Sequence, residues 1–322
     1  ALKEYGYDAD LILTPQNRFG RQFRAYLANR FLDVEEDGLG RKIHQVISFR
    51  FPSFAVKHPS HVCWLNHRLR EYYDLWEVLA SGLSFRAKFK ETIKKRFIHA
   101  LDKYLLKHNV TKLYAQSQTI QKRLEKWGRI QAEVLYPPPP QRNYRLEAYQ
   151  NFIFSVSRLQ KLKRLDLLID TFRYIRNKEV KAIIIGDGPE RENLTLKIKE
   201  NNLENRVFLL GRADEETLLS HYARCLAVFF GPFKEDYGFV TGEAFASRKA
   251  VLTTSDSGGP AELVRNGQTG YVLDPNPKII AGKVDELAEN RGLAEKMGQN
   301  AYEFISRLTW EETVKRLVIC ER

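Results

Sequence analysis

Short apolar runs alternate with segments of helical periodicity along most of the chain. In the second half these runs are rich in β-branched and aromatic residues, and they predict strands at residues 151–156, 182–185, 206–210, 226–230, 250–254 and 271–273. Helical patterns lie between them, for example from Leu165 to Ile175. Strands that alternate with helices indicate an α/β domain built on a parallel sheet.

The first half shows the same alternation less regularly. Strands are predicted at residues 10–14, 42–49, 61–65 and 112–117, and helices at residues 18–30, 86–108 and 121–127. The first residues resemble the end of a helix, with Gly6 as its stop. Because an α/β domain normally opens with a strand ahead of its first helix, we expect a first strand and its loop to precede residue 1.

Four consecutive prolines, residues 137–140, mark the predicted boundary between two domains. A proline run ends regular structure, and a chain of 322 residues is long enough for two domains. We place the first domain at residues 1–143 and the second at residues 144–307. The pattern Thr309-Trp-Glu-Glu312 is a capping box, so we expect a final helix within residues 308–322 that packs back toward the first domain.

The composition narrows the class of protein. No apolar run approaches the roughly 20 residues of a membrane span, and the first residues lack the core of a signal peptide. The three cysteines, Cys63, Cys225 and Cys320, show no metal-binding or redox spacing. These features favour a cytoplasmic protein, either soluble or bound at the surface of a membrane.

The positive charge is confined to the first half. Lys and Arg outnumber Asp and Glu by 26 to 14 over residues 1–145, and the two classes balance at 26 each over residues 146–322. Within the first half, the helix predicted at residues 86–108 is basic. Its apolar residues recur at intervals of four and are Phe89, Ile93, Phe97, Leu101 and Leu105. Its seven basic residues are Lys88, Lys90, Lys94, Lys95, Arg96, Lys103 and Lys107. Two interpretations, which do not exclude each other, are that this helix lies on an anionic membrane and that its apolar stripe packs on the sheet.

The stretch of residues 229–248 joins a predicted strand to a helix through a loop. It places Glu235 in the loop and Glu243 in the first turn of the helix, so both can line one cleft at the carboxyl end of the strand. The helix start at residues 238–242 offers free N–H groups to a phosphate. Alternatively, Glu235 is a solvated loop residue and Glu243 only complements the helix dipole.

His58, His61, Cys63 and His67 raise the question of a zinc site, because all four side chains can bind zinc. The predicted strand at residues 61–65 argues against it, since His58 and His67 lie in loops at its opposite ends. His67 remains the best polar candidate of the first half, because side chains at a strand end reach the cleft of an α/β domain. A structural role for this lone histidine is the alternative.

These motifs together resemble the family 4 glycosyltransferases, which are retaining enzymes of the GT-B fold. In that fold two Rossmann-like domains with parallel sheets face each other across a cleft. The matching pieces occur in family order over residues 151–275: Phe154-Ser-Val-Ser-Arg-Leu159 with Lys163, Ile185-Gly-Asp-Gly-Pro189, Phe208-Leu-Leu-Gly211, the Glu-x7-Glu motif from Glu235 to Glu243, and Gly258-Gly-Pro-Ala-Glu262 with Gly267-Gln-Thr-Gly270.

The first half resembles the family more weakly, through Trp64-Leu-Asn-His67, Ala115-Gln-Ser117 and Leu135-Tyr-Pro-Pro138. The family's glycine-rich loop after its first strand has no counterpart here, and Ser157 stands where a glycine is common. Asp8-Ala-Asp10 imitates the DxD motif of metal-dependent transferases, but it lies far from the phosphate-binding loops in sequence.

The resemblance implies a role for each matching residue. Arg158 and Lys163 bind the donor diphosphate and assist its departure, Glu243 accepts hydrogen bonds from the ribose, and Glu235 faces the hydroxyls of the donor sugar. The resemblance also implies that backbone amides around Gly238, Phe239 and Val240 bind the phosphate. The base then lies against the edge at Gly211 and Arg212. His67, from the acceptor-side first domain, contacts the sugar.

The implied activity is transfer of a hexose from a nucleoside-diphosphate sugar to a polysaccharide or lipid-linked glycan. A UDP-sugar such as UDP-glucose is favoured, with GDP-mannose as the alternative. No metal or cofactor is expected, because cationic side chains and a helix start can neutralise the leaving diphosphate. A protein that binds sugar nucleotides without transfer is a second hypothesis. The pI near 9.5 suggests nucleic-acid binding as a third, but that function gives no reason for the set Arg158, Lys163, Glu235 and Glu243.

Overall fold

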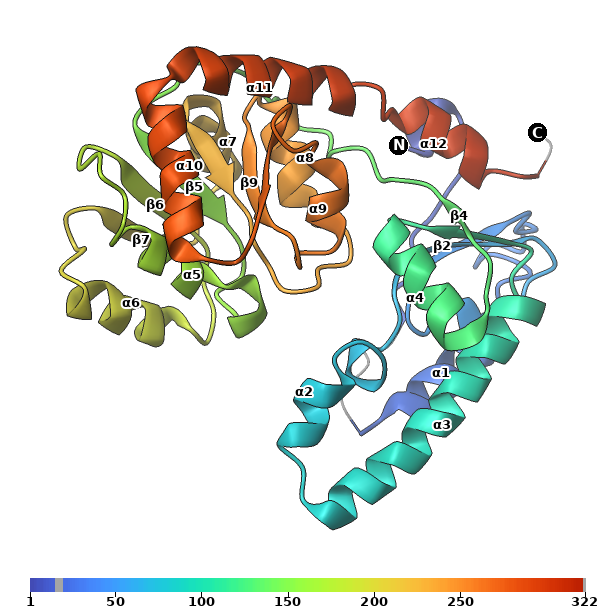
Figure 1. Cartoon of the computed structure of the whole chain (residues 1–322). Helices are drawn as coiled ribbons and strands as arrows, with labels where there is room; N and C mark the ends of the chain where they lie inside the picture. The colour runs from blue at the N-terminus through green and yellow to red at the C-terminus, as the bar shows by residue number, and fades with distance from the viewer. Residues whose placement is uncertain (15–19, 321–322) are drawn as a thin grey trace. The chain divides into compact units, whose positions relative to one another are not determined.

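The computed structural model describes residues 1–14 and 20–320, which form two compact units (Figure 1). Unit 1 comprises Ala1–Pro137 together with Thr309–Arg322, and unit 2 comprises Pro138–Leu308. The boundary lies at the start of the predicted proline run rather than after residue 143. Each unit is built on a parallel β-sheet with helices, which confirms the predicted α/β class.

Unit 2 contains a six-stranded sheet in which every neighbouring pair is parallel. Its strands, which include all six predicted ones, are β5 (Phe152–Val156), β6 (Lys181–Ile185), β7 (Val207–Gly211), β8 (Ala227–Phe229), β9 (Val251–Thr254) and β10 (Gly270–Leu273). Its helices are α5 (Leu165–Thr171), α6 (Arg191–Glu200), α7 (Glu215–Arg224), α8 (Phe239–Ala246), α9 (Gly259–Leu263), α10 (Pro277–Glu289) and α11 (Arg291–Ile305).

The strand order of this sheet, β10-β9-β8-β5-β6-β7, contains a topological switch point. The chain moves outward from β5 through β6 to β7, and then returns to place β8 on the other side of β5. Residues Ile153 and Phe154 of β5 pair with Ala227 and Val228 of β8. The loops that follow β5 and β8 therefore leave the same edge of the sheet side by side, where α/β sheets bind ligands.

The strands of unit 2 are apolar on both faces because helices cover both. Ile153, Phe154, Ala182, Ile184 and Leu252 are fully buried, and most of them belong to one large core cluster. Parallel strands buried in this way read as continuous apolar runs, which is why the sequence pattern located them well.

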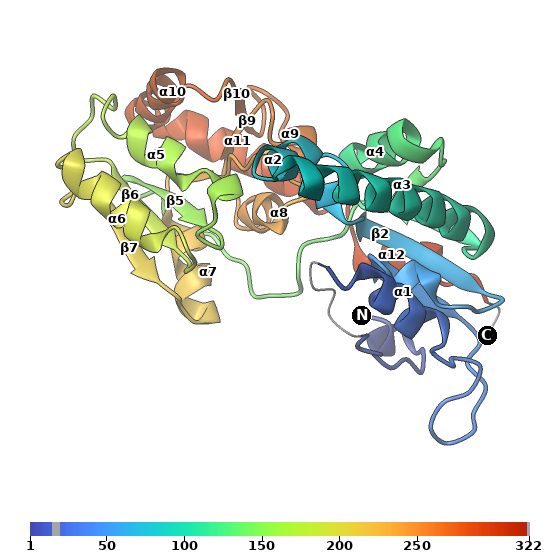
Figure 2. The ribbon, with the colours of Figure 1, turned by 90° about the horizontal axis from the view of Figure 1, so that it is seen from below.

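Unit 1 contains a four-stranded parallel sheet in the order β1-β2-β3-β4. The strands are β1 (Val46–Arg50), β2 (His61–His67), β3 (Lys112–Ala115) and β4 (Glu133–Val134). The helices are α1 (Gln22–Arg30), α2 (Trp76–Ser81), α3 (Phe85–His108), α4 (Gln118–Gly128) and α12 (Trp310–Leu317). Figure 2 shows α3, coloured teal, as a long helix of this unit.

Four predictions for unit 1 need correction. Residues 10–14 do not form a strand, and Leu11 and Leu13 are exposed, because this segment has no β-sheet neighbour in the described part of the chain. The strand expected at residues 42–49 is confined to β1, and the one expected at residues 61–65 continues to His67. The first residues of the helix expected at 18–30 lie outside the described residues, and α1 begins at Gln22.

The last helix packs on the sheet of unit 1. Trp310 meets Trp64 edge to face with ring centroids 6.2 Å apart, and the Tyr114 hydroxyl donates to the Arg316 carbonyl at 3.0 Å. The Thr309 side chain accepts from the Glu312 N–H, as a capping box requires. Across residues 1–14 and 20–320, no helix combines the length and apolar character needed to cross a membrane.

Candidate active site

Two of the predicted site residues meet at the switch point of unit 2. Lys163 ends the loop that follows β5, and Glu235 lies in the loop that follows β8. The Lys163 Nζ donates to the Glu235 Oε2 at 2.6 Å, and both side chains are partly buried. The edge of the sheet therefore presents a cation and a carboxylate together, the first suited to phosphate and the second to hydroxyl groups.

Arg158 lies in the same loop after β5, and its side chain is exposed. Its guanidinium has no hydrogen bond or ion pair within the described chain. The backbone around it is held by the turn after β6, because Ser157 N–H donates to Ile185 and Leu159 N–H donates to Asp187. Gly186, with φ of 144°, fits this turn only as glycine, since a Cβ there would lie 1.8 Å from the Ser157 carbonyl oxygen.

Gly211 and Arg212 lie at the exit of β7, next to that turn. The Gly186 N–H donates to the Gly211 carbonyl at 2.8 Å. The Arg212 Nε lies 3.4 Å from the Asp187 Oδ2, and its side chain is largely exposed. The predicted base-binding edge is thus connected through a single turn to the loop that carries Arg158.

Arg164 connects the loops of the site through hydrogen bonds. Its guanidinium donates to the Gly231 carbonyl at 2.9 Å, to the Pro232 carbonyl at 3.0 Å, and to both oxygens of Asp256 at 2.9 and 2.6 Å. The loops after β5, β8 and β9 consequently share one partly buried cation. Arg164 is not among the predicted site residues, and its only signal in the sequence is its position beside Lys163.

The loop carrying Glu235 runs alongside the loop after β9. The Glu235 N–H donates to the Ser257 carbonyl at 2.7 Å, and the Glu235 carbonyl accepts from the Gly259 N–H at 3.0 Å. Gly258 has φ of 77°, and a Cβ there would lie 2.4 Å from the Glu235 carbonyl oxygen. This backbone pairing fixes where the Glu235 side chain starts, so Glu235 is not the solvated loop residue of the alternative reading.

Glu243 is buried, with 7% of its surface exposed, and it lies in the second turn of α8 rather than in the first turn as predicted. Its Oε1 accepts from the Arg142 guanidinium at 2.7 Å, and its Oε2 accepts from the Tyr222 hydroxyl at 2.8 Å. Burial raises the pKa of Glu243, and these two partners oppose that rise. Arg142 also meets Glu215 at 3.0 Å. A charge that only complements the helix dipole does not fit this environment.

The start of α8 carries the predicted phosphate-binding amides. Gly238 caps the helix with φ of 81°, and Phe239 and Val240 are its first two residues. In the described part of the chain, the N–H groups of these two residues have no protein acceptor, as expected for the first turn of a helix. They remain available to an anion.

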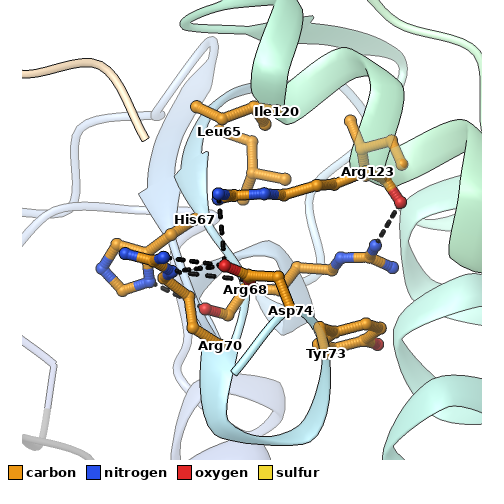
Figure 3. A pocket seen from close by; sticks show the side chains of 9 residues that line it. Leu65, His67, Arg68, Arg70, Tyr73, Asp74, Ile120 and Arg123 are labelled. Atoms are coloured by element: carbon orange, nitrogen blue, oxygen red, sulfur yellow. Dashed lines mark hydrogen bonds and ion pairs between the residues drawn. The ribbon is translucent and has the colours of Figure 1, made fainter. Parts of the chain in front are cut away.

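His67 belongs to unit 1, where it is the last residue of β2. Its Nδ1 lies 2.9 Å from the Arg68 carbonyl oxygen. Figure 3 shows that His67 lines a pocket in which the Asp74 carboxylate binds Arg70 at 2.7 Å and Arg123 at 3.2 Å. The arginines come from the segment after β2 and from α4, and they give this pocket a basic wall. The contact of His67 with a donor sugar stays a prediction.

The histidines of the zinc alternative have other partners. The His61 Nε2 lies 2.8 Å from the Ser48 hydroxyl, and His58 lies within hydrogen-bonding distance of the carbonyls of Ser60 and Ile43. No group of three or more His, Cys, Asp or Glu residues suited to a metal occurs among residues 1–14 and 20–320. Asp8 and Asp10 form exposed ion pairs with Arg41 and Lys3.

The family model described as glycosyl transferases group 1 matches residues 141–304. An uncharacterized glycosyltransferase of Methanocaldococcus jannaschii is 29% identical over 70% of this chain and 62% of its own length. The N-acetyl-alpha-D-glucosaminyl L-malate synthase of Bacillus anthracis is 25% identical, over 51% of this chain and 43% of its own. The poly(ribitol-phosphate) alpha-N-acetylglucosaminyltransferase of Staphylococcus aureus is 29% identical, over 48% of this chain and 32% of its own. The chain thus spans less than two thirds of these relatives.

Two solved structures share the fold. A mutant of S. aureus TarM in complex with fondaparinux, alpha-GlcNAc-glycerol and UDP matches with a TM-score of 0.66 and 20% identity, over 84% of this chain and 54% of that protein. Anabaena HepE in complex with UDP and glucose matches with a TM-score of 0.61 and 22% identity, over 68% and 65%. These likenesses, with the two parallel-sheet units, show the predicted GT-B fold.

Proposed function

The chain belongs to the glycosyl transferases group 1 family, and we propose that it transfers a hexose from a nucleoside-diphosphate sugar to a glycan acceptor with retention of the anomeric configuration. The observation that carries this proposal is the contact of Lys163 with Glu235 at the switch point of unit 2. The two groups lie 2.6 Å apart, so the cation can bind the diphosphate of a donor while the carboxylate accepts from hydroxyls of the adjoining sugar.

In this proposal the diphosphate lies between two side chains and a helix start. Arg158 supplies a planar fork, Lys163 a point charge, and the first amides of α8, at Phe239 and Val240, supply N–H donors. Negative charge grows on the diphosphate as the sugar leaves, so these groups stabilise the leaving group. Because they supply the positive charge, we propose a reaction that needs no metal ion.

Glu243 is proposed to bind the ribose. A carboxylate has about four acceptor positions, and the hydrogen bonds from Arg142 and Tyr222 occupy two of them. The remaining positions can accept from two hydroxyls, and the buried partners fix the direction in which the carboxylate points. Glu235 then serves the sugar hydroxyls, Gly211 and Arg212 the base, and His67 the sugar from unit 1.

A UDP-sugar such as UDP-glucose is the proposed donor, with a polysaccharide or lipid-linked glycan as acceptor. The similar S. aureus and Anabaena structures both hold UDP, which supports this choice of nucleotide. GDP-mannose is the second candidate, supported by 29% identity to an alpha-1,3/1,6-mannosyltransferase of Dictyostelium discoideum over 47% of this chain and 40% of that protein. The nucleotide and the sugar are thus separate parts of the proposal.

We also propose that the enzyme works in the cytoplasm and beside an anionic membrane. The three cysteines are free, and burial raises the pKa of the thiols of Cys63 and Cys225 to about 12. Inert thiols of this kind suit a reducing compartment. The excess of basic residues in unit 1 supports the proximity to anionic lipid.

Thermal unfolding with a panel of nucleotide sugars and free nucleotides tests the proposal. A ligand at 100 times its dissociation constant adds about 2.7 kcal/mol to the free energy of unfolding. We expect stabilisation by UDP and one UDP-sugar, and no stabilisation by GDP-mannose. Release of UDP from the stabilising sugar nucleotide, measured with and without candidate acceptors, separates a transferase from a protein that only binds. Absence of stabilisation by every nucleotide would contradict the proposal.

A further inference from the structure

The outward face of α3 exposes large apolar side chains. Phe85, Phe89, Ile93, Phe97 and Tyr104 are 88%, 66%, 43%, 63% and 60% exposed. The first four recur every four residues, so they form a stripe along one side of the helix. Of the apolar residues expected to pack on the sheet, Phe89, Ile93 and Phe97 therefore face away from it.

The opposite side of α3 holds the helix in unit 1. Ile98, Leu105 and Leu106 are buried there. Glu91 accepts from the Tyr72 hydroxyl at 2.5 Å, and Asp102 accepts from the hydroxyls of Tyr26 and Tyr73. Both carboxylates of α3 thus accept hydrogen bonds from residues in the interior of unit 1.

The cations of α3 divide between the two sides. Lys94 bonds to Glu91 at 2.7 Å, and Lys95 lies over the Trp76 ring, so these two lysines face inward. The exposed basic residues are Arg86, Lys88, Lys90, Arg96, Lys103 and Lys107. No Asp or Glu of α3 is exposed. The outward face therefore combines aromatic side chains with positive charge alone.

We infer that this outward face of α3, defined by the five exposed apolar and six exposed basic residues above, binds directly to an anionic lipid surface. Solubility explains the lysines and arginines, but it gives no reason for exposed phenylalanines beside them. A helix with apolar and basic residues on its free side lies in a membrane interface, where the rings enter the headgroup region and the cations meet lipid phosphates.

This inference rests on the membrane proximity proposed above and names the surface responsible for it, but it can be tested apart from the proposed transfer, because lipid binding needs neither donor nor acceptor. The full chain should sediment with vesicles that contain phosphatidylglycerol and should remain in solution with vesicles of phosphatidylcholine alone. Binding should fall at least about ten-fold between 0.1 M and 1 M salt, since the Debye length shrinks from roughly 10 Å to about 3 Å. Failure to bind anionic vesicles at 0.1 M salt would overturn the inference.

Two triple variants test the two components of the surface. Replacement of Phe85, Phe89 and Phe97 by Ser should lower vesicle binding at least about ten-fold at low salt, because the apolar contribution is lost. Replacement of Lys88, Lys90 and Arg96 by Glu should lower it by at least about a hundred-fold on anionic vesicles. Each substituted side chain is exposed, so these variants should fold and keep their thermal response to UDP.

Matched controls come from α6 of unit 2. Leu196 is 56% exposed, and Lys199 is also exposed. The variants Leu196→Ser and Lys199→Glu should bind vesicles as the unchanged chain does, and an equal loss in these controls would overturn the inference. Sedimentation velocity without lipid adds a further test. Self-association that the Phe→Ser variant abolishes, together with unchanged vesicle binding, would assign the surface to a second copy of the chain instead.

Discussion

Glu235 and Glu243 are eight positions apart in the sequence, yet the fold gives them different environments. Glu235 lies in a loop, and its side chain is 21% exposed and bonds to one cation, Lys163. Glu243 lies in the second turn of α8, and its side chain is 9% exposed and bonds to Arg142 and Tyr222. Within the described residues, Glu235 thus has a single side-chain partner, whereas Glu243 has two, of which Tyr222 is fully buried.

This difference separates two ways of preparing a binding site. A partly exposed pair such as Lys163 and Glu235 contributes little to stability and leaves both groups accessible. A buried carboxylate with fixed partners has a set orientation before a ligand arrives, and its removal is costly because it leaves those partners unpaired. The variants below test whether the two carboxylates differ in this way.

The largest effect is expected for Glu243→Ala. This change removes the partner of the fully buried Tyr222 hydroxyl and one of the two carboxylates beside Arg142. We expect the free energy of unfolding to fall by about 3 kcal/mol, as measured by urea denaturation. Glu235→Ala is the control, with an expected loss below about 1 kcal/mol. Equal losses would remove the proposed contrast.

The next effect concerns nucleotide affinity. Arg158→Ala and Lys163→Ala should each weaken binding of UDP by roughly 10 to 150-fold, because a charge-assisted phosphate contact contributes about 1.5 to 3 kcal/mol. Isothermal titration calorimetry measures this change. Arg173 is an exposed arginine away from the loop, and Arg173→Ala should leave the affinity unchanged. Unaltered binding in both site variants would exclude Arg158 and Lys163 from the phosphate site.

A smaller effect is expected for Glu235→Gln on free nucleotide. The amide carbonyl can still accept from Lys163, so the affinity for UDP should change by less than about three-fold. The kcat/KM for the nucleotide sugar should fall roughly ten-fold, since the hydrogen bond from a sugar hydroxyl then has a neutral acceptor in place of a charged one. If Glu235→Gln and Glu243→Gln weaken UDP equally, the assignment of one carboxylate to the sugar and the other to the ribose is wrong.

The smallest effect is the pH dependence of stability that Glu243 should contribute. Burial raises its pKa in the folded state above the ordinary 4.5. Below that value both states are protonated, and as the pH rises the unfolded chain ionises first, so stability is lost through the raised pKa. As the pH rises, the free energy of unfolding of the unchanged chain should therefore fall relative to that of Glu243→Gln. A pH-independent difference would contradict the raised pKa.

The strands of unit 2 were predicted well because a parallel sheet covered on both faces needs continuous apolar runs. The glycines that shape the site also have a local cause, since Gly186 and Gly258 fit positions where a Cβ would collide with the backbone. The strand expected at residues 10–14 failed, because an apolar run becomes a strand only when a neighbour pairs with it.

The sequence by itself determined the α/β class, the strands of unit 2 and the identity of the candidate residues, because periodicity and motif spacing are local properties. Only the tertiary structure decided which groups meet. It placed Lys163 against Glu235, Arg142 and Tyr222 against Glu243, and turned Phe89 and Phe97 outward. Arg142 and Glu243 are 101 positions apart, and contacts over such separations depend on how elements pack rather than on local pattern. A helical stripe likewise shows that one face is apolar, but its neighbours decide whether that face is covered.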